Sequence, residues 1–328
     1  MNALLLSLPL LFASGSIGDQ LRKDRLPADV DFVMHLDLEG FKATELWKLA
    51  QKDGDFHAEF DELKEVEERF GLNPLTDVRA ITLYKVEKEE DPTVVLLSTS
   101  AKVDAALEKL RGEAGYRRLS EGKIELHTWK ERNQDDENVF AYLHGSGDER
   151  VVVLASKRES ALHAARVLRG EDVSLARSGT GLTVAPASGS FLYMSAASLS
   201  ALDEFAPASQ VLGLAQGLQF DVGEAGGLLQ AHMGLAAADA DKAFHLSNTV
   251  NGFISLAYLA GQELGDVLEL LSGLKVRAQG ANVTMDFEFE LDRLVEILRS
   301  LDDDGGDEEE LEPVEPVDRS EKEKVRRR

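Results

Sequence analysis

Residues Asn282–Glu290 read Asn-Val-Thr-Met-Asp-Phe-Glu-Phe-Glu, so polar and apolar side chains alternate strictly along this stretch. Successive side chains of a β-strand point to opposite faces, so the apolar ones share one face and the polar ones share the other. A second short stretch, Val276–Gln279 (Val-Arg-Ala-Gln), also alternates apolar and polar residues. Gly280 lies between the two stretches, which favours a hairpin. The pattern therefore predicts an antiparallel sheet with one face toward the core and one face toward water.

The same reading predicts strands and helices that interleave along the rest of the chain. Further strands are predicted at Phe32–Leu38, Val78–Val86, Val94–Thr99, Tyr116–Leu119, Lys123–Trp129, Val139–Leu143, Arg150–Ala155, Phe191–Ser195, Leu218–Val222 and Leu228–Leu235. Helices are predicted within Ala43–Phe70, Lys102–Arg111, Glu159–Leu168, Leu199–Gln216, Ala240–Leu271 and Leu291–Leu301. Interleaved hairpins and helices predict an α+β fold, with antiparallel sheets and helices packed on one face.

Four stretches of the first half have counterparts, in the same order, in the second half. They are Asp31–Glu39 with Ser190–Ser198, Thr93–Ser100 with Leu229–Ala236, Val103–Leu107 with Ala240–Phe244, and Gly122–Leu126 with Gly280–Met285. Each match alone is weak, but all four occur in the same order in both halves, which favours an internal repeat. We therefore expect two similar lobes at residues 26–170 and 190–301, joined by a connector at 171–189 and forming either a cleft or a continuous curved sheet.

Residues 1–18 have the features of a secretory signal peptide. The apolar run Leu4–Phe12 is followed by small residues, and the cleavage-site pair is Ala13/Gly15 or Ser16/Gly18. A bilayer span needs about 20 apolar residues, so the run is too short to cross a membrane. We expect export to the periplasm or the exterior and no integral membrane span in the mature chain. The alternative is a buried N-terminal helix or strand.

Residues 302–328 have a composition that cannot form a core. Asp302–Asp318 contains ten acids and no bases, and Arg319–Arg328 contains six bases and two acids. The segment has no aromatic residue and few large apolar ones, so burial would not offset its ordering entropy. We therefore predict a disordered tail.

Composition excludes several functional classes. The chain of 328 residues has 60 acids against 36 bases, a formal charge of −24, and no cysteine. The charge argues against binding to nucleic acid, whose phosphates attract Lys and Arg, and against docking on an anionic membrane. The lack of cysteine removes disulfides, thiol catalysis and Cys-ligated metal centres.

Two phrases resemble a known group of proteins. The stretch Leu26–Gly40 (LPADVDFVMHLDLEG) and the stretch Pro186–Ser195 (PASGSFLYMS) each pair a proline and small residues with an apolar strand. They look like the openings of the two halves in a loose group of exported bacterial proteins of unknown function. The resemblance covers about residues 26–301 and implies an α+β fold in two related halves, and export. It implies no activity and no catalytic residues.

Motifs for nucleotide binding or covalent catalysis are missing from the sequence. It contains no Gly-x-x-x-x-Gly-Lys, no Gly-x-Gly-x-x-Gly and no Gly-x-Ser-x-Gly. The nearest trace, Gly145-Ser146-Gly147, is predicted to be a hairpin turn. Trp47 and Trp129 are predicted to be buried or half-buried rather than part of a sugar platform.

Histidines and carboxylates that share one face of a helix or strand are candidate metal ligands. Asp53, His57 and Asp61 share one side of an unbroken helix, although Gly54 favours a break, and the alternative is a solvated acidic face. His35 and Asp37 share one face of the first strand. The remaining histidines considered lie on a hairpin strand and at the start of a turn, at His127 and His144. We nominate no catalytic, cofactor-binding or metal-binding residue.

The segment Val250–Ala260 carries no charge, and its apolar residues cover more than half of a helix circumference. Such a helix is buried on several sides, or it contributes to an apolar groove or an oligomer contact.

The leading hypothesis is an exported, non-catalytic binding or structural protein whose partner is an unknown protein or small ligand. One alternative is a carrier of an apolar ligand or lipid, based on the helix near Phe253. Another is a metal-dependent hydrolase that uses acids with His35 or His57.

Overall fold

A computed structural model of the chain describes residues 20–51, 67–68, 70–86, 93–112, 115–130, 138–179, 182–198, 215–260 and 265–304. The predicted signal peptide at 1–18, residues 199–214 of the helix predicted over Leu199–Gln216 and the tail beyond Asp304 lie outside these residues. Ala215 and Gln216, predicted as the end of that helix, begin strand β9 instead. The chain divides into two compact units, Met1–Leu291 and Asp292–Arg328.

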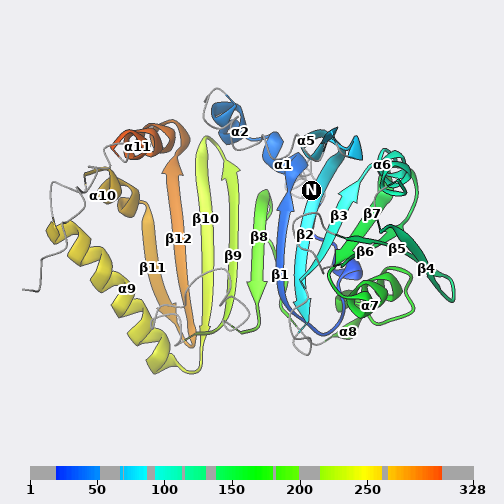
Figure 1. Cartoon of the computed structure of the whole chain (residues 1–328). Coiled ribbons are helices and arrows are strands. Elements are labelled where there is room, and N and C mark those ends of the chain that lie inside the picture. The colour runs from blue at the N-terminus through cyan, green and yellow to red at the C-terminus, as the bar shows by residue number, and fades with distance from the viewer. Residues whose placement is uncertain are drawn as a thin grey trace, which may run out of the picture. The chain divides into compact units, whose positions relative to one another are not determined.

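The described strands form one antiparallel sheet of twelve strands within the first unit (Figure 1). Across the sheet the order is β11-β12-β10-β9-β8-β1-β2-β3-β7-β6-β5-β4. The strands are β1 (Val30–Asp37), β2 (Val78–Val86), β3 (Val94–Thr99), β4 (Arg117–Glu121), β5 (Ile124–Lys130), β6 (Asn138–His144), β7 (Arg150–Ala155), β8 (Ser190–Ala196), β9 (Ala215–Ala225), β10 (Leu228–Ala237), β11 (Leu274–Gln279) and β12 (Asn282–Glu290). The predicted α+β class with an antiparallel sheet is confirmed.

Strands β1 and β8, the first strands of the two predicted lobes, pair with each other and make the sheet continuous. In this pair Met34 lies opposite Met194 and His35 lies opposite Tyr193. Outward from the pair, the order reads β1-β2-β3-β7-β6 on one side and β8-β9-β10-β12-β11 on the other. Strand β12 thus occupies the place of β7, whereas the sequence comparison aligned it with β5.

The hairpins form where glycine-containing turns separate alternating runs. Strands β4 and β5, β6 and β7, β9 and β10, and β11 and β12 pair as predicted. Gly145 and Gly147, in the turn between β6 and β7, have φ of 77° and 58°, a conformation that glycine adopts without strain. The Gly-Ser-Gly trace is therefore a hairpin turn.

The described helices are short in the first half of the chain and longer in the second. They are α1 (Leu38–Lys42), α2 (Glu45–Ala50), α5 (Pro74–Asp77), α6 (Val103–Leu110), α7 (Arg158–Leu168), α8 (Leu175–Ser178), α9 (Ala240–Ala260), α10 (Gly265–Ser272) and α11 (Leu291–Asp304), with 3-10 turns at Lys23–Arg25 and Gly147–Glu149. Helix α2 begins after Thr44, whose hydroxyl accepts a hydrogen bond from the Trp47 N–H at 3.0 Å. The Trp47 side chain is buried, as predicted, and packs edge-on against Phe41.

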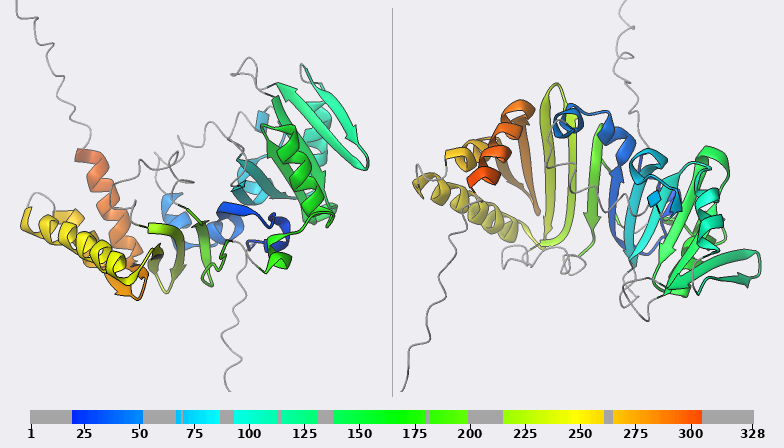
Figure 2. Two further views of the ribbon diagram at one scale, coloured as in Figure 1. Left: turned by 90° about the horizontal axis from the view of Figure 1, so that it is seen from below. Right: turned by 45° about the horizontal axis from the view of Figure 1, so that its top comes forward.

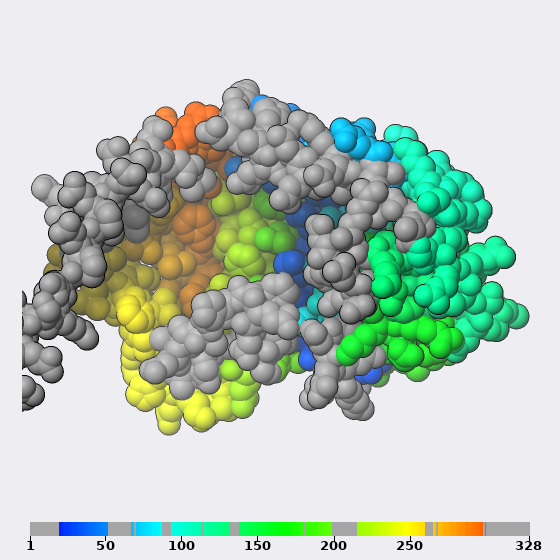
Figure 3. Space-filling view, in the orientation of Figure 1, coloured from blue at the N-terminus to red at the C-terminus, as the bar shows by residue number. Residues whose placement is uncertain are grey.

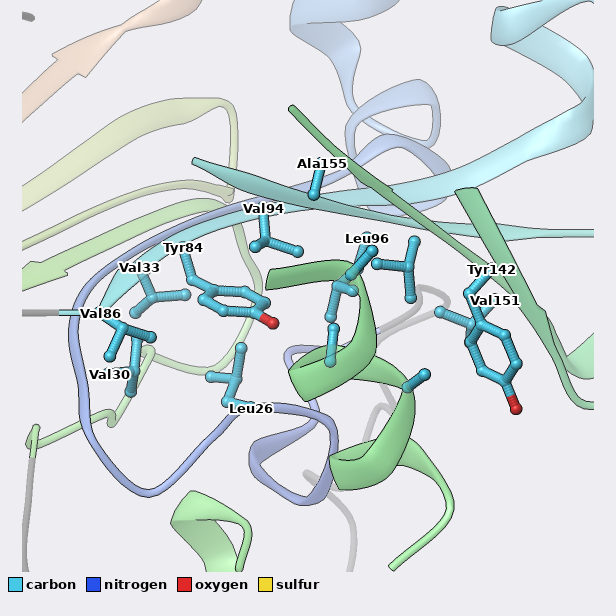
Figure 4. Close-up of a cluster of buried hydrophobic side chains, with 14 of the residues drawn as sticks. Leu26, Val30, Val33, Tyr84, Val86, Val94, Leu96, Tyr142, Val151 and Ala155 are labelled. Carbon is cyan, nitrogen blue, oxygen red and sulfur yellow. The ribbon is translucent and has the colours of Figure 1, made fainter. Parts of the chain in front are cut away.

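The first half carries helices on both faces of the sheet, whereas the sequence predicted helices on one face. Helix α7 packs on the face that holds Val33, Tyr84 and Val153, the largest buried cluster of the molecule (Figure 4). Helix α6 packs on the opposite face, against Val152 and its neighbours. Adjacent residues of β7 therefore pack into two different hydrophobic clusters, one on each face of the sheet, because side chains alternate along a strand.

In the second half, the apolar face of the sheet is the one covered by α9. Ala243 and Leu246 of α9 are completely buried against a cluster that includes Phe32, Leu235 and Val283. The N-terminal part of α9 lies beside β10–β12, and its C-terminal end diverges from them (Figures 1 and 2). The opposite face of these strands carries polar side chains, which confirms the alternation read from Asn282–Glu290.

The second unit is described only over α11. Apolar residues recur at Leu291, Leu294 and Ile297 while charged residues occupy other positions, so the helix is amphipathic. It ends three residues beyond the predicted Leu301.

Candidate functional site

His35 and Asp37, considered as a metal pair, have structural roles instead. The Nδ1 atom of His35 lies 2.8 Å from Thr82 Oγ1, and the side chain is buried. Asp37 accepts a hydrogen bond from the Gly40 N–H at 2.8 Å and caps α1. Both side chains point to the same sheet face, as the alternation requires, but their polar atoms are engaged within the fold.

His127 and His144 lie in hairpin strands beside tyrosines. His127 Nδ1 is 2.8 Å from the Tyr116 hydroxyl, and His144 Nδ1 is 3.5 Å from the Tyr142 hydroxyl. Burial lowers the pKa of both imidazoles below the ordinary 6.5, and nearby arginines lower it further. Both rings are therefore neutral at neutral pH.

The other metal candidates, Asp53, His57 and Asp61, lie outside the described residues. Within the described ranges, no group of three or more histidine and carboxylate side chains is arranged to hold a metal ion. In the same ranges, no helix has the length and apolar composition needed to cross a membrane.

The structure instead brings polar side chains together on the open face of β8–β12, in rows that run across the strands. One row joins Ser195, Gln219, Gly234, Thr284 and Arg277, each lying opposite the next in the strand register. The row beside it joins Tyr193, Asp221, His232, Asp286 and Lys275. We call the surface formed by Ser195, Gln219, Asp221, His232, Gly234, Arg277, Asn282, Thr284 and Asp286 the polar tray.

The centre of the polar tray is recessed because the residues there have small side chains or none. Gly217 lies opposite Ala236 on the neighbouring strand, and Gly234 lies one place along on the same face. A hollow of about 1050 Å³ lies over them, and a smaller one of about 190 Å³ adjoins it at His232. A Cβ atom at Gly234 would meet no heavy atom of the described residues within 4 Å, so none of these residues fills the space above it.

Asp286 organises the charges of the polar tray. Its Oδ1 atom lies 2.7 Å from His232 Nδ1, and its Oδ2 atom lies 3.4 Å from an Arg277 nitrogen. Asp221, on β9 opposite His232, accepts a hydrogen bond from the Ser190 hydroxyl at 3.0 Å. The carboxylate of Asp286 thus fixes an imidazole and a guanidinium at the rim of the hollow, where both can bind polar groups.

Neutral hydrogen-bonding groups complete the lining. The Gln219 amide donates to the Thr183 carbonyl oxygen at 3.0 Å, and the Ser195 hydroxyl donates to the same oxygen at 2.9 Å. Thr284 and Asn282 also line the hollow. The polar tray combines several neutral donors and acceptors with the guanidinium of Arg277, the imidazole of His232 and two carboxylates, those of Asp221 and Asp286.

No family model matches the chain, and no curated protein matches it. Crystal forms I and III of TP0453 are similar in structure, with TM-scores of 0.48 and 0.47 and 9% sequence identity. This is a distant similarity of fold. The similar regions cover 86% of this chain and 98% and 99% of the two TP0453 chains.

Sequence reasoning missed the polar tray as a site. It identified the polar face of Asn282–Glu290, but His232 and Arg277 were not considered, because they are adjacent to Asp286 only through the strand register. The apolar segment Val250–Ala260 was identified, and the structure shows several of its large side chains exposed rather than buried.

Proposed function

We propose that this protein is an exported, non-catalytic binding protein whose polar tray holds a small hydrogen-bonding ligand. The observation that supports the proposal is the open hollow of about 1050 Å³ above Gly234, with polar side chains around it. Binding sites are concave and carry a few polar groups that fix the orientation of a ligand. The charged groups are few, with Arg277 paired to Asp286 and Asp221 as a second carboxylate, so the polar tray suits a ligand with small net charge.

The polar tray has the groups of a binding surface rather than those of an activated nucleophile. Among the described residues, the His232 imidazole hydrogen-bonds to Asp286 and to no hydroxyl group. Covalent catalysis by serine or threonine needs a base within hydrogen-bond reach of the hydroxyl. We therefore assign His232 and Arg277 to ligand contact, with Asp286 positioning both.

We further propose that residues 26–170 and 190–301 are two related lobes, with 171–189 as their connector. The mirrored strand order on the two sides of the β1–β8 pair supports this proposal. The extra hairpin β4–β5 distinguishes the first lobe. In this view, no helix described within residues 215–291 covers the face of the second lobe that corresponds to the face under α7 in the first.

Ligand binding is tested with a thermal-stability screen of small polar molecules. A ligand at 100 times its Kd stabilises a protein by about 2.7 kcal/mol, which raises Tm by roughly 5 °C for a domain of this size. We expect at least one class of compound to raise the Tm of the wild type. The Gly234→Leu variant should abolish that shift, because its side chain would project into the hollow from the centre of its floor, where an added Cβ atom meets no described heavy atom within 4 Å.

The matched control is Gly252→Leu, which makes the same change at another open glycine, on α9. It should keep the full ligand-induced shift, and Arg277→Ala should weaken it. The proposal fails if no compound stabilises the wild type, or if Gly234→Leu responds as the wild type does.

Export is tested by the N-terminus of the protein expressed in a bacterial host with a secretion pathway. We expect the chain to appear outside the cytoplasm and to begin at Ser16 or at Asp19, the residues that follow the two predicted cleavage-site pairs. Intact mass and N-terminal sequencing measure this directly. An unprocessed chain that remains in the cytoplasm would refute export.

A further inference from the structure

Helix α9 exposes five large apolar side chains, four of them in its C-terminal part. The exposed fractions are 59% for Phe244, 60% for Phe253, 61% for Leu256, 48% for Tyr258 and 82% for Leu259. Among the described residues the one other exposed large apolar side chain is Val173. Nearly all such exposure is thus concentrated on one helix, which reaches the molecular surface at the margin of the space-filling view (Figure 3).

Three polar side chains in the middle of this helix donate hydrogen bonds to the preceding turn of the helix. Thr249 donates to the His245 carbonyl oxygen at 2.9 Å, Asn251 to that of Ser247 at 2.9 Å, and Ser255 to that of Asn251 at 2.8 Å. No charged residue lies between Val250 and Ala260. Polar groups that bond to the preceding turn need fewer partners from outside, so this surface is suited to an apolar environment.

The exposed apolar side chains spread widely around the helix. At about 100° per residue, Phe244, Phe253, Leu256, Tyr258 and Leu259 span roughly 220° of the circumference. A helix that packs on a globular partner presents a stripe of about 100°. Fluid acyl chains can cover a broad and rounded surface more completely than a single rigid partner can.

Area and charge argue against a second copy of the chain as the occupant. Large side chains bury roughly 150–250 Å² each, so five that are about 60% exposed offer about 450–750 Å². A stable interface needs about 800 Å² per partner. Each copy also carries a formal charge of −24, which opposes self-association.

We propose that the C-terminal part of α9 docks on the surface of an electrically neutral lipid bilayer. Residues Val250–Ala260 are about 16 Å long, well short of the roughly 30 Å hydrocarbon core, so the contact involves one leaflet. Apolar side chains of an interfacial helix enter the boundary between headgroups and acyl chains. The strongly negative chain favours zwitterionic lipid over anionic lipid. This inference is independent of the polar tray.

The test is flotation of the exported form of the protein with phosphatidylcholine vesicles. We expect the wild type to float, and the double variant Leu256→Ser/Leu259→Ser to partition at least about tenfold more weakly, because two exposed apolar side chains are lost. Both positions are exposed, so circular dichroism and Tm should stay near the wild-type values. Val173→Ser is the matched control, since it removes an exposed apolar side chain elsewhere and should leave flotation unchanged.

Other outcomes overturn the proposal. They are a wild type that does not float and a double variant that floats equally well. Stronger flotation with anionic phosphatidylglycerol vesicles at low salt would contradict the choice of a neutral surface. A dimer in sedimentation that the double variant dissociates, without flotation, would assign the surface to a second copy. Gly234→Leu should float as the wild type does, so failure of the polar tray would not affect this result.

Discussion

Replacing Phe32 by alanine should lower the free energy of unfolding by about 3–5 kcal/mol, the usual cost of truncating a fully buried phenylalanine. Phe32 has no solvent exposure and lies on β1, directly opposite Ala196 of β8. Its ring belongs to the cluster that includes Leu218, Leu235 and the anchor of α9, Leu246. The substitution therefore leaves a cavity at the strand pair that joins the two halves of the sheet, where neighbouring strands cannot collapse to fill it.

Denaturant unfolding followed by circular dichroism measures this effect. The matched control is Phe244→Ala, which makes the same change at a side chain that is 59% exposed. Its cost should stay within about 1 kcal/mol, because little apolar surface returns to water. Equal costs for the two variants would show that Phe32 does not pack at the centre of the core.

Replacing Gly145 by alanine should destabilise the protein by about 2–5 kcal/mol. Two effects add at this position. Its φ is 77°, where a side chain costs about 1–2 kcal/mol. A Cβ atom there would also lie 2.4 Å from the Glu149 backbone oxygen, which cannot move without opening the turn between β6 and β7.

Gly122 separates these two effects. Its φ is 59°, but a Cβ atom there would meet nothing within 4 Å. Gly122→Ala should therefore cost only the conformational part, about 1–2 kcal/mol. The difference between the two variants, measured by the same unfolding experiment, reports the clash with Glu149. The absence of any difference would refute the tight turn described here.

Strand positions could be predicted from sequence because alternation is a local property. Asn282–Glu290 was predicted as a strand with the observed bounds, and Arg150–Ala155 likewise. The helical region Ala240–Leu271 was predicted with a break near Asn251-Gly252 or near Gly261, and the structure describes α9 to Ala260 and α10 from Gly265. Burial was harder to predict, because Phe253 and Leu259 are apolar yet exposed, and no local pattern reveals whether a partner covers them.

Candidate sites were harder still, since they depend on distance in space. His35 was considered from its position beside Asp37 in the sequence, but the structure pairs it with Thr82, which is far away in the chain. No pattern in the sequence singles out His232 or Arg277, although Asp286 contacts both. His232 acquires its carboxylate partner from the neighbouring strand, and spacing in the sequence does not reveal such a pair.

The sequence by itself determined the α+β class, the faces of the strands and the uncharged composition of Val250–Ala260, because side-chain periodicity and charge are properties of short segments. Only the tertiary structure decided that β1 and β8 pair to make one sheet, that Asp286 lies between His232 and Arg277, and that the end of α9 lacks cover. Those facts depend on register and packing between segments distant in the chain, where many pairings satisfy the same local pattern and only the sum of contacts selects one.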